Sequence, residues 1–307
     1  MILIVNLNPS LDIVFNTWEI KKGKVHRSKR ELMTPGGKGI NVAKTLKVFE
    51  EDIFVLGFCG GSSGKILKEE LDKREIPYEF IESKSMTRFA IGIMEEKGSL
   101  MTVINGSGEE IEEEKIEEFF EKFKEYIKEA STLIISGSLP LNVPENIYAK
   151  MLNLAKNYPI IKVVDARGKA LLKALEERPD IIKPNREEAE EILEFKLKEE
   201  RDLKRAGDFF QLKGVKNTLI SLGEKGAFLN SSGKMYYAFL PPAKGINWGT
   251  GDAFLSGFIY GLIHDDHIFA LKVACATAYV KVKKWEIEKN NLKEIFDLTS
   301  KVNIRKL

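Results

Sequence analysis

The segment Ile2-Leu3-Ile4-Val5-Asn6-Leu7 indicates the fold class of this chain. Its side chains are mostly β-branched or leucine and do not alternate with polar ones, which predicts a strand buried on both faces. Similar runs recur at residues 53–57, 132–136, 160–165 and 218–222. Helical patterns lie between them, so we predict a mainly parallel central sheet flanked by helices on both faces, an α/β fold.

One charged helix and two extended insertions complete the expected architecture. In residues 111–127 apolar side chains recur at helical spacing and leave Glu and Lys on a solvated face, which indicates an amphipathic helix. Residues 13–34 and 86–104 contain strand-like runs without a helix between them, the second with a turn at Glu95-Glu96-Lys97-Gly98. We expect a single α/β domain over residues 1–307, with these two insertions forming a small β-sheet lid over a cleft.

Composition and rare residues exclude several classes of protein. The 48 Lys and Arg nearly balance the 46 Asp and Glu, so nothing in the overall charge favours nucleic acid or an anionic membrane as partner. Cys59 and Cys275 form no Cys-x-x-Cys pair, and His264 and His267 have no third ligand in view. We therefore expect neither a disulfide framework nor a zinc site. The chain starts without a basic leader and has no long apolar run, which predicts a cytoplasmic protein.

A glycine-rich stretch, Gly36-Gly37-Lys38-Gly39-Ile40-Asn41, resembles a phosphate cradle. It lacks the Gly-x-x-x-x-Gly-Lys-Ser/Thr spacing of a nucleotide P-loop. Bare backbone at a helix start, an ammonium group and an amide instead suit a polyhydroxy ligand that carries an anion, and a plain strand-to-helix turn is the alternative. Residues 59–66 also miss the P-loop pattern, and we expect Ser62 or Ser63 to cap the helix that follows.

A second glycine-rich stretch, Gly249-Thr250-Gly251-Asp252, leads into an apolar helix. Its free N–H groups and the helix dipole favour negative charge. Such a pocket can stabilise charge that develops on a transferring phosphoryl group. Asp252 can accept a proton from an attacking hydroxyl. The alternative is that Asp252 only caps the helix.

Two later segments place polar groups at strand ends. In Lys183-Pro184-Asn185-Arg186-Glu187-Glu188, the Asn185 amide and the Glu188 carboxylate can hold Mg²⁺ through water beside nucleotide phosphates. A simple capping box between the same two residues is the alternative. In Ser221-Leu222-Gly223-Glu224-Lys225-Gly226-Ala227 the glycines allow a base or phosphates to approach closely, or they only form a hairpin.

In this order, these segments resemble the ribokinase-like sugar kinases, and specifically the phosphofructokinase B branch, which includes 1-phosphofructokinase and tagatose-6-phosphate kinase. The resemblance covers nearly the whole chain. Six motifs carry it, at residues 8–12, 36–43, 136–140, 183–188, 221–227 and 249–252. Each motif is weak alone, but their common order and spacing make the resemblance specific.

The resemblance implies phosphoryl transfer from ATP with Mg²⁺ to a hydroxyl of a sugar phosphate. Asp252 would be the base, with the N–H groups of Gly249, Thr250 and Gly251 as the anion hole. The substrate-binding residues would be Asp12, Gly36, Gly37 and Asn41 on the sugar hydroxyls, Lys38, Arg88 and Arg27 on its phosphate, and Ser138 in the cleft. The nucleotide-binding residues would be Lys183, Asn185, Glu188, Ser221, Gly223, Lys225 and Gly226, with Asn185 and Glu188 also holding the metal through water.

The sequence departs from the family pattern beside the second glycine-rich stretch. Asn247-Trp248 stands where Thr-Val is usual, and Thr250 replaces a common alanine. We expect the bulky Trp248 to reshape the nucleotide pocket.

Together these features predict an ATP-dependent kinase that makes a ketohexose bisphosphate, with fructose 1-phosphate as the preferred acceptor. Tagatose 6-phosphate and fructose 6-phosphate remain alternatives, because the same cations serve each phosphate. A regulator that binds these ligands without catalysis is the alternative from another class. Isolated lid strands would expose their backbone edges, so we also predict a homodimer through the lid strands.

Overall fold

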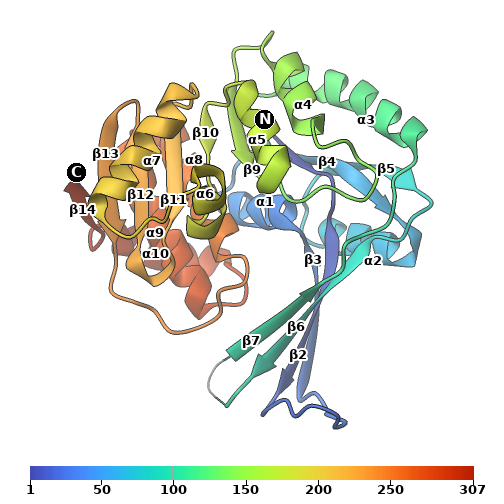
Figure 1. Cartoon of the computed structure of the whole chain (residues 1–307). Coiled ribbons are helices and arrows are strands. Elements are labelled where there is room, and N and C mark those ends of the chain that lie inside the picture. Colours follow the sequence, from blue (N-terminus) through green and yellow to red (C-terminus); the bar gives the residue numbers. More distant parts are fainter. Residues whose placement is uncertain (98–99) are drawn as a thin grey trace.

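The computed structural model of the chain describes residues 1–97 and 100–307. It contains a ten-stranded sheet and a separate four-stranded sheet that projects from it (Figure 1). Gly98, the last residue of the turn expected at Glu95-Glu96-Lys97-Gly98, lies outside the described residues.

The large sheet is mainly parallel, as the sequence predicts. Its order is β14-β13-β12-β11-β10-β9-β8-β1-β4-β5, parallel from β5 to β11 and antiparallel from β11 to β14. The strands are β1 (Ile2–Asn6), β4 (Ile53–Gly60), β5 (Tyr78–Ser83), β8 (Thr132–Ser136), β9 (Ile161–Asp165), β10 (Ile181–Ile182), β11 (Asn217–Ser221), β12 (Ala227–Ser231), β13 (Lys234–Phe239) and β14 (Asn303–Lys306).

Strand β1 lies inside this sheet and is covered on both faces. Leu3 and Val5 face one core, whereas Ile2 and Ile4 face the other. This explains why its side chains do not alternate with polar ones, since successive residues of a strand point to opposite faces. The sequence prediction of a strand buried on both sides is confirmed.

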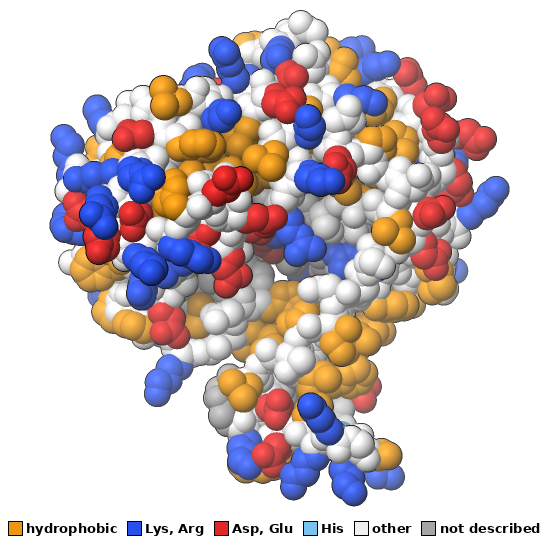
Figure 2. All heavy atoms as spheres, in the orientation of Figure 1, with side chains coloured by type: hydrophobic (Ala, Val, Ile, Leu, Met, Phe, Trp, Pro, Cys, Tyr) orange, Lys and Arg blue, Asp and Glu red, His pale blue; other side chains and the backbone are white. Residues whose placement is uncertain are grey.

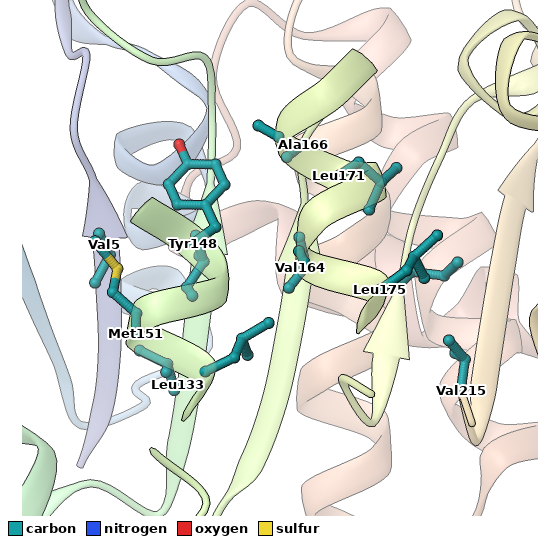
Figure 3. Packing of buried hydrophobic residues seen from close by; sticks show 14 of the residues in the cluster. Val5, Leu133, Tyr148, Met151, Val164, Ala166, Leu171, Leu175 and Val215 are labelled. Carbon is teal, nitrogen blue, oxygen red and sulfur yellow. The ribbon is translucent and has the colours of Figure 1, made fainter. Parts of the chain in front are cut away.

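Helices cover both faces of the sheet. The first core receives α3, α4, α5, α6 and α7, and the second receives α1, α2, α8 and α9. Figure 3 shows the first core from close by, where Tyr148 and Met151 of α4 lie near Val5 of the sheet. The helices are α1 (Lys38–Val48), α2 (Gly61–Asp72), α3 (Glu113–Tyr126), α4 (Ile147–Ala155), α5 (Gly168–Glu176), α6 (Arg186–Leu193), α7 (Glu200–Leu212), α8 (Thr250–His264), α9 (His267–Lys283) and α10 (Leu292–Thr299).

The small sheet, called the lid sheet below, has the order β3-β2-β6-β7. Its strands are β2 (Ser10–Thr17), β3 (Arg30–Gly36), β6 (Arg88–Glu95) and β7 (Leu100–Asn105). Ser10 pairs with Gly36 on one side and with Arg88 on the other. The root of the lid sheet therefore brings two of the family-like motifs, at residues 8–12 and 36–43, together with Arg88.

The structure corrects one local expectation. The expected Ser62 or Ser63 cap is wrong, because α2 begins at Gly61 with Gly60 as its N-cap, and the Ser63 hydroxyl donates to the Thr87 carbonyl instead. His264 ends α8 and His267 begins α9, and the described residues contain no cluster of three metal-ligating side chains. Over residues 1–97 and 100–307, no helix is long and apolar enough to cross a membrane.

Candidate active site

Polar residues from several of the motifs meet at one edge of the large sheet. Strands β9, β10 and β11 end there at Asp165, beside Lys183 and at Ser221. Helices α1, α6 and α8 also begin at this edge. The carboxyl edge of an open parallel sheet is where ligands of α/β proteins bind. Figure 2 shows charged side chains of both signs at the hollow where the lid sheet meets the body.

Asp165 is the centre of a buried ion network. Its Oδ1 lies 3.1 Å from the Lys38 Nζ and 3.3 Å from the Lys183 Nζ. The Lys38 Nζ also lies 3.3 Å from Glu188 Oε1. Burial alone would raise the pKa of Asp165, but the Lys183 and Lys38 ammonium groups outweigh burial and hold this pKa below its ordinary value. The carboxylate therefore stays charged.

Sequence reasoning missed Asp165. It belongs to no glycine-rich motif, but it is an acidic residue at the end of an otherwise apolar parallel strand, and this signal was available. Its second oxygen, Oδ2, is buried and has no hydrogen-bond partner among the described residues. A buried carboxylate oxygen without a partner is a suitable acceptor for a hydrated cation.

Asp252 is buried in the first turn of α8. Its Oδ2 accepts a hydrogen bond of 2.9 Å from the Asn41 Nδ2. Burial raises the pKa of Asp252, and the Asp165 charge raises it further, against the opposing effect of Lys38 and Asn41. The alternative role as helix cap is wrong, because the N-cap is Gly249 and no side chain caps this helix. A buried carboxyl with a raised pKa is a stronger proton acceptor than an exposed one.

The start of α8 forms a positive pocket. Gly249 adopts a left-handed conformation with φ 73°, and Thr250 and Gly251 are the first two helical residues. A Cβ added to Gly251 would lie 3.4 Å from the Lys183 Nζ, so this ammonium group lies directly beside the helix start. The helix N-terminus and the lysine both favour an anion at this place.

A cavity of about 600 Å³ opens beside the α8 start. Its lining includes Asn185, Ser221, Gly223 and Gly226, which the sequence predicts for the nucleotide side, and Thr250 of the expected anion hole. The other walls are largely apolar and come from residues 240–243 and from helix α9. Polar groups at one end and apolar walls at the other suit the phosphates and the base of a nucleotide.

Four residues expected on or beside the nucleotide side do not line this cavity, namely Lys183, Glu188, Lys225 and Trp248. Trp248 is absent from its lining, so the expectation that Trp248 reshapes the nucleotide pocket is wrong. Its indole ring turns to the lid sheet instead, where it meets Gly92. Lys225 lines a smaller cavity with Tyr237 and Arg305, and not the cavity beside α8.

Asp12 lies at the root of the lid sheet and is 3% exposed. Its Oδ1 accepts a hydrogen bond of 2.5 Å from the Ser10 hydroxyl. A Cβ on Gly36 would fall 2.1 Å from the Asp12 carboxylate, so the carboxylate packs directly on bare backbone. Burial raises the pKa of Asp12 to about 6, although the Ser10 hydrogen bond, Lys44 and Arg88 oppose this shift.

Asn8 connects Arg88 and Ser138, which the sequence predicts on the acceptor side. The Arg88 Nε donates to the Asn8 carbonyl at 3.2 Å, and the Asn8 Nδ2 donates to the Ser138 hydroxyl at 3.2 Å. Arg88 also donates to the Gly106 carbonyl at 3.2 Å. Asn8 therefore links Arg88 to Ser138, and the Arg88 charge also acts on Asp12, so the three residues lie in one region, and their role toward an acceptor stays a prediction.

Lys38 and Arg27 are placed differently from the expectation. Lys38 contacts Asp165 and Glu188, which lie toward the nucleotide side, and these carboxylates raise its pKa against the effect of burial. Arg27 is exposed in the connection between β2 and β3, away from the root of the lid sheet (Figure 1). Only Arg88 of the three cations expected on the acceptor phosphate is tied to Asn8 and Ser138.

Asn185 and Glu188 form a capping box, which is one of the two alternatives that the sequence offers for them. The Asn185 Oδ1 accepts from the Glu188 N–H at 2.8 Å, and the Glu188 Oε2 accepts from the Asn185 N–H at 2.9 Å. Because these bonds hold one oxygen of each side chain, direct metal ligation by both is not built into the site. The Asn185 and Glu188 side chains and the unpartnered Asp165 oxygen together suit a cation that keeps its water shell.

Residues 5–290 match the pfkB family of carbohydrate kinases. The chain belongs to this family. It is 34% identical over 268 residues to tagatose-6-phosphate kinase of Staphylococcus epidermidis, covering 86% of each chain. It is 32% identical over 263 residues to 1-phosphofructokinase of Bacillus subtilis, covering 85% of this chain and 86% of the other.

The fold also matches a solved structure of the same kind. Phosphofructokinase-2 from Escherichia coli in complex with fructose-6-phosphate superposes with a TM-score of 0.89 at 24% identity, covering 97% of this chain and 99% of the other. The expected ribokinase-like architecture with a separate small sheet is thus confirmed, and this pfkB protein is a sugar-phosphate kinase.

Proposed function

We propose that this pfkB kinase transfers a phosphoryl group from ATP to a hydroxyl of a ketohexose phosphate, converting fructose 1-phosphate to fructose 1,6-bisphosphate. Tagatose 6-phosphate and fructose 6-phosphate are the alternative acceptors. The observation that carries the proposal is the position of Asp252. Its carboxylate is bonded to Asn41 on the acceptor side, and its helix begins at Thr250 and Gly251, which line the 600 Å³ cavity.

In the proposed reaction Asp252 accepts the proton of the attacking hydroxyl. The Asn41 Nδ2 fixes the orientation of its carboxylate. General base catalysis of this kind contributes a factor of about 10² to 10⁴ in rate. The backbone N–H groups at residues 249–251 and the Lys183 ammonium group stabilise the charge on the phosphoryl group as it moves.

Asp165, Asn185 and Glu188 would hold Mg²⁺ through water beside the nucleotide phosphates. When bound, this ion would supply positive charge to the phosphate oxygens. We assign the phosphate already on the acceptor to Arg88, with Ser138 beside it. Lys38 is already paired with Asp165 and Glu188. We therefore assign its charge to these carboxylates, between the acceptor and the nucleotide, and not to the acceptor phosphate.

A panel of coupled ADP-release assays on sugars and sugar phosphates tests this function. We expect turnover with a ketohexose phosphate and none with the unphosphorylated sugar. Turnover only with unphosphorylated sugars or nucleosides would contradict the role of Arg88. Replacement Asp252→Asn should abolish turnover but keep binding of both substrates, with the exposed Asp208→Asn as control. Binding of both ligands by the unmodified protein without any turnover would favour a regulator.

We also propose a homodimer through the lid sheet. Met33 pairs with Ile13, Ile13 with Ile91, and Ile91 with Ile104, so these side chains share one face, opposite to Gly92. On this face Met33 is 48% exposed and Ile104 is 59% exposed. Figure 2 shows apolar side chains on the surface of the projecting sheet.

An apolar sheet face of this kind is typical of an interface with another chain. A tetrameric inhibited form is known for phosphofructokinase-2 from Escherichia coli. Sedimentation should give a dimer at micromolar concentration, and Ile104→Lys should give a monomer. A monomeric unmodified protein would contradict the proposal.

A further inference from the structure

The indole ring of Trp248 lies directly on the lid sheet. A Cβ added to Gly92 of β6 would fall 2.2 Å from the Trp248 Cζ3 and 2.9 Å from its Cε3. The Met101 Cε of β7 would lie 2.6 Å from the same Cβ. The ring therefore occupies the place where any other residue at position 92 would put its side chain.

The other side of this contact belongs to the body of the protein. The rings of Trp248 and Trp285 meet edge to face, with centroids 5.6 Å apart and an interplanar angle of 86°. Trp285 follows helix α9, and the Lys281 Nζ lies 5.3 Å from the centroid of its ring. Edge-to-face aromatic pairs are a favourable and specific geometry. Trp285 thus supports the Trp248 ring from the body side.

On both sides of this contact, the chain continues within a few residues to groups of the proposed site. Trp248 is the residue before Gly249, where the α8 pocket begins. Gly92 pairs with Val14, two residues along β2 from Asp12. Gly92 is also four residues along β6 from Arg88. A single ring therefore joins the sheet that carries the acceptor residues to the loop that precedes the phosphoryl pocket.

We propose that Trp248 is a positioning residue that couples the lid sheet to the α8 pocket. While its ring rests on Gly92, the lid sheet stays over the acceptor and the loop before Gly249 keeps its N–H groups aimed at the phosphoryl group. The coupling rests on the proposed function in one respect, namely that the lid sheet covers a sugar phosphate. A ring that only filled space would stabilise the fold without linking the two halves of the site.

The first test replaces the ring. In Trp248→Ala, we expect the KM for the ketohexose phosphate to rise about 10-fold, the equivalent of losing one or two kcal/mol of contact. The KM for ATP should change less than about 3-fold. Hydrogen exchange of the β6 and β7 amides should become faster, because these two strands lose the Trp248 contact with the body. Trp248→Phe should restore part of each effect.

The second test perturbs the same contact from the lid side. Gly92→Ala alone should raise the KM for the acceptor in the same way, because the new methyl group displaces the ring. In the Trp248→Ala background, Gly92→Ala should have little further effect, since the flexible end of the Met101 side chain can move away from the methyl group once the ring is gone. This non-additivity is the signature of a shared contact. Trp18→Ala is the control, because Trp18 belongs to the lid region but is 59% exposed.

Two results would overturn the proposal. One is additive effects of Trp248→Ala and Gly92→Ala, and the other is unchanged exchange of β6 and β7 in Trp248→Ala. Exchange is measured on the protein without substrate, so it separates this proposal from the proposed function. If Trp248→Ala speeds the exchange of β6 and β7 but the unmodified protein phosphorylates no sugar phosphate, the structural role of Trp248 would be supported and the proposed acceptor would be rejected.

Discussion

Replacing Asp12 by asparagine should make the protein more stable at neutral pH but should weaken its binding of the acceptor sugar phosphate. The Asp12 carboxyl is buried, and its pKa is raised from 3.8 to about 6. One unit of pKa difference corresponds to 1.36 kcal/mol, so keeping this group ionised at pH 7 costs the folded state about 3 kcal/mol. Asparagine has the same shape, and its Oδ1 can still accept the bond from Ser10.

The pH dependence follows from the sign of the shift. The folded-state pKa of Asp12 lies above the unfolded value, so the folded protein binds this proton more tightly. The destabilisation by Asp12 is absent below pH 3.8 and complete above about pH 6. The advantage of Asp12→Asn should therefore grow across this interval and then level off.

Thermal unfolding of both proteins between pH 4 and 8 measures this effect. At pH 7.5 we expect the Tm of Asp12→Asn to exceed that of the unmodified protein by about 5 °C or more. The two values should converge near pH 4. Asp208→Asn, in an exposed position of α7, is the matched control and should show no pH-dependent difference. A lower Tm of Asp12→Asn at pH 7.5 would refute the reasoning, because ionisation of the buried carboxyl would then stabilise the fold.

Three further substitutions and the removal of metal probe the rest of the site. The Asn41 bond lowers the pKa of Asp252, the proposed base, so Asn41→Ala should move the acid limb of the kcat profile to higher pH; an unmoved limb would place the base elsewhere. Asp165→Asn leaves the Lys183 ammonium group buried without its partner and should destabilise the protein by about 3 to 5 kcal/mol, seen as an earlier denaturant midpoint. Gly226→Ala would place its Cβ 2.1 Å from the Ala238 carbonyl at a φ of 99°, so the KM for ATP should rise while the KM for the acceptor stays constant. Removing divalent metal with EDTA should stop turnover reversibly, and full activity in EDTA would reject the metal assignment.

The sequence was sufficient to predict the sheet and the helices that cover it. Residues such as Ile2 to Val5 allow little else, because a run of β-branched side chains without polar positions needs apolar cover on both faces. The position of Asp252 at a helix start could also be predicted, since the glycines before it leave the N–H groups of that start without side-chain partners. These features are local, and their physical cause lies within a few residues.

Features that depend on distant partners could not be predicted in this way. Lys38 meets carboxylates 127 and 150 residues further along the chain, so the motif around it could not reveal that its charge is already paired. Trp248 lies in the turn before α8, and the direction of its ring depends on Gly92 in the lid sheet. Asp165 could have been predicted as a site residue, because the carboxyl end of an apolar parallel strand is a recognisable place for a functional group.

The contact between Trp248 and Gly92 also has an evolutionary consequence. While tryptophan occupies position 248, position 92 has no room for a side chain, so the glycine there is fixed by a residue in a different part of the chain. A lineage with a smaller residue at position 248 is free to place alanine or serine at position 92, and a lineage that regained the tryptophan would first have to restore the glycine. The two positions should therefore covary among relatives of this protein, and the order of their replacement should be constrained.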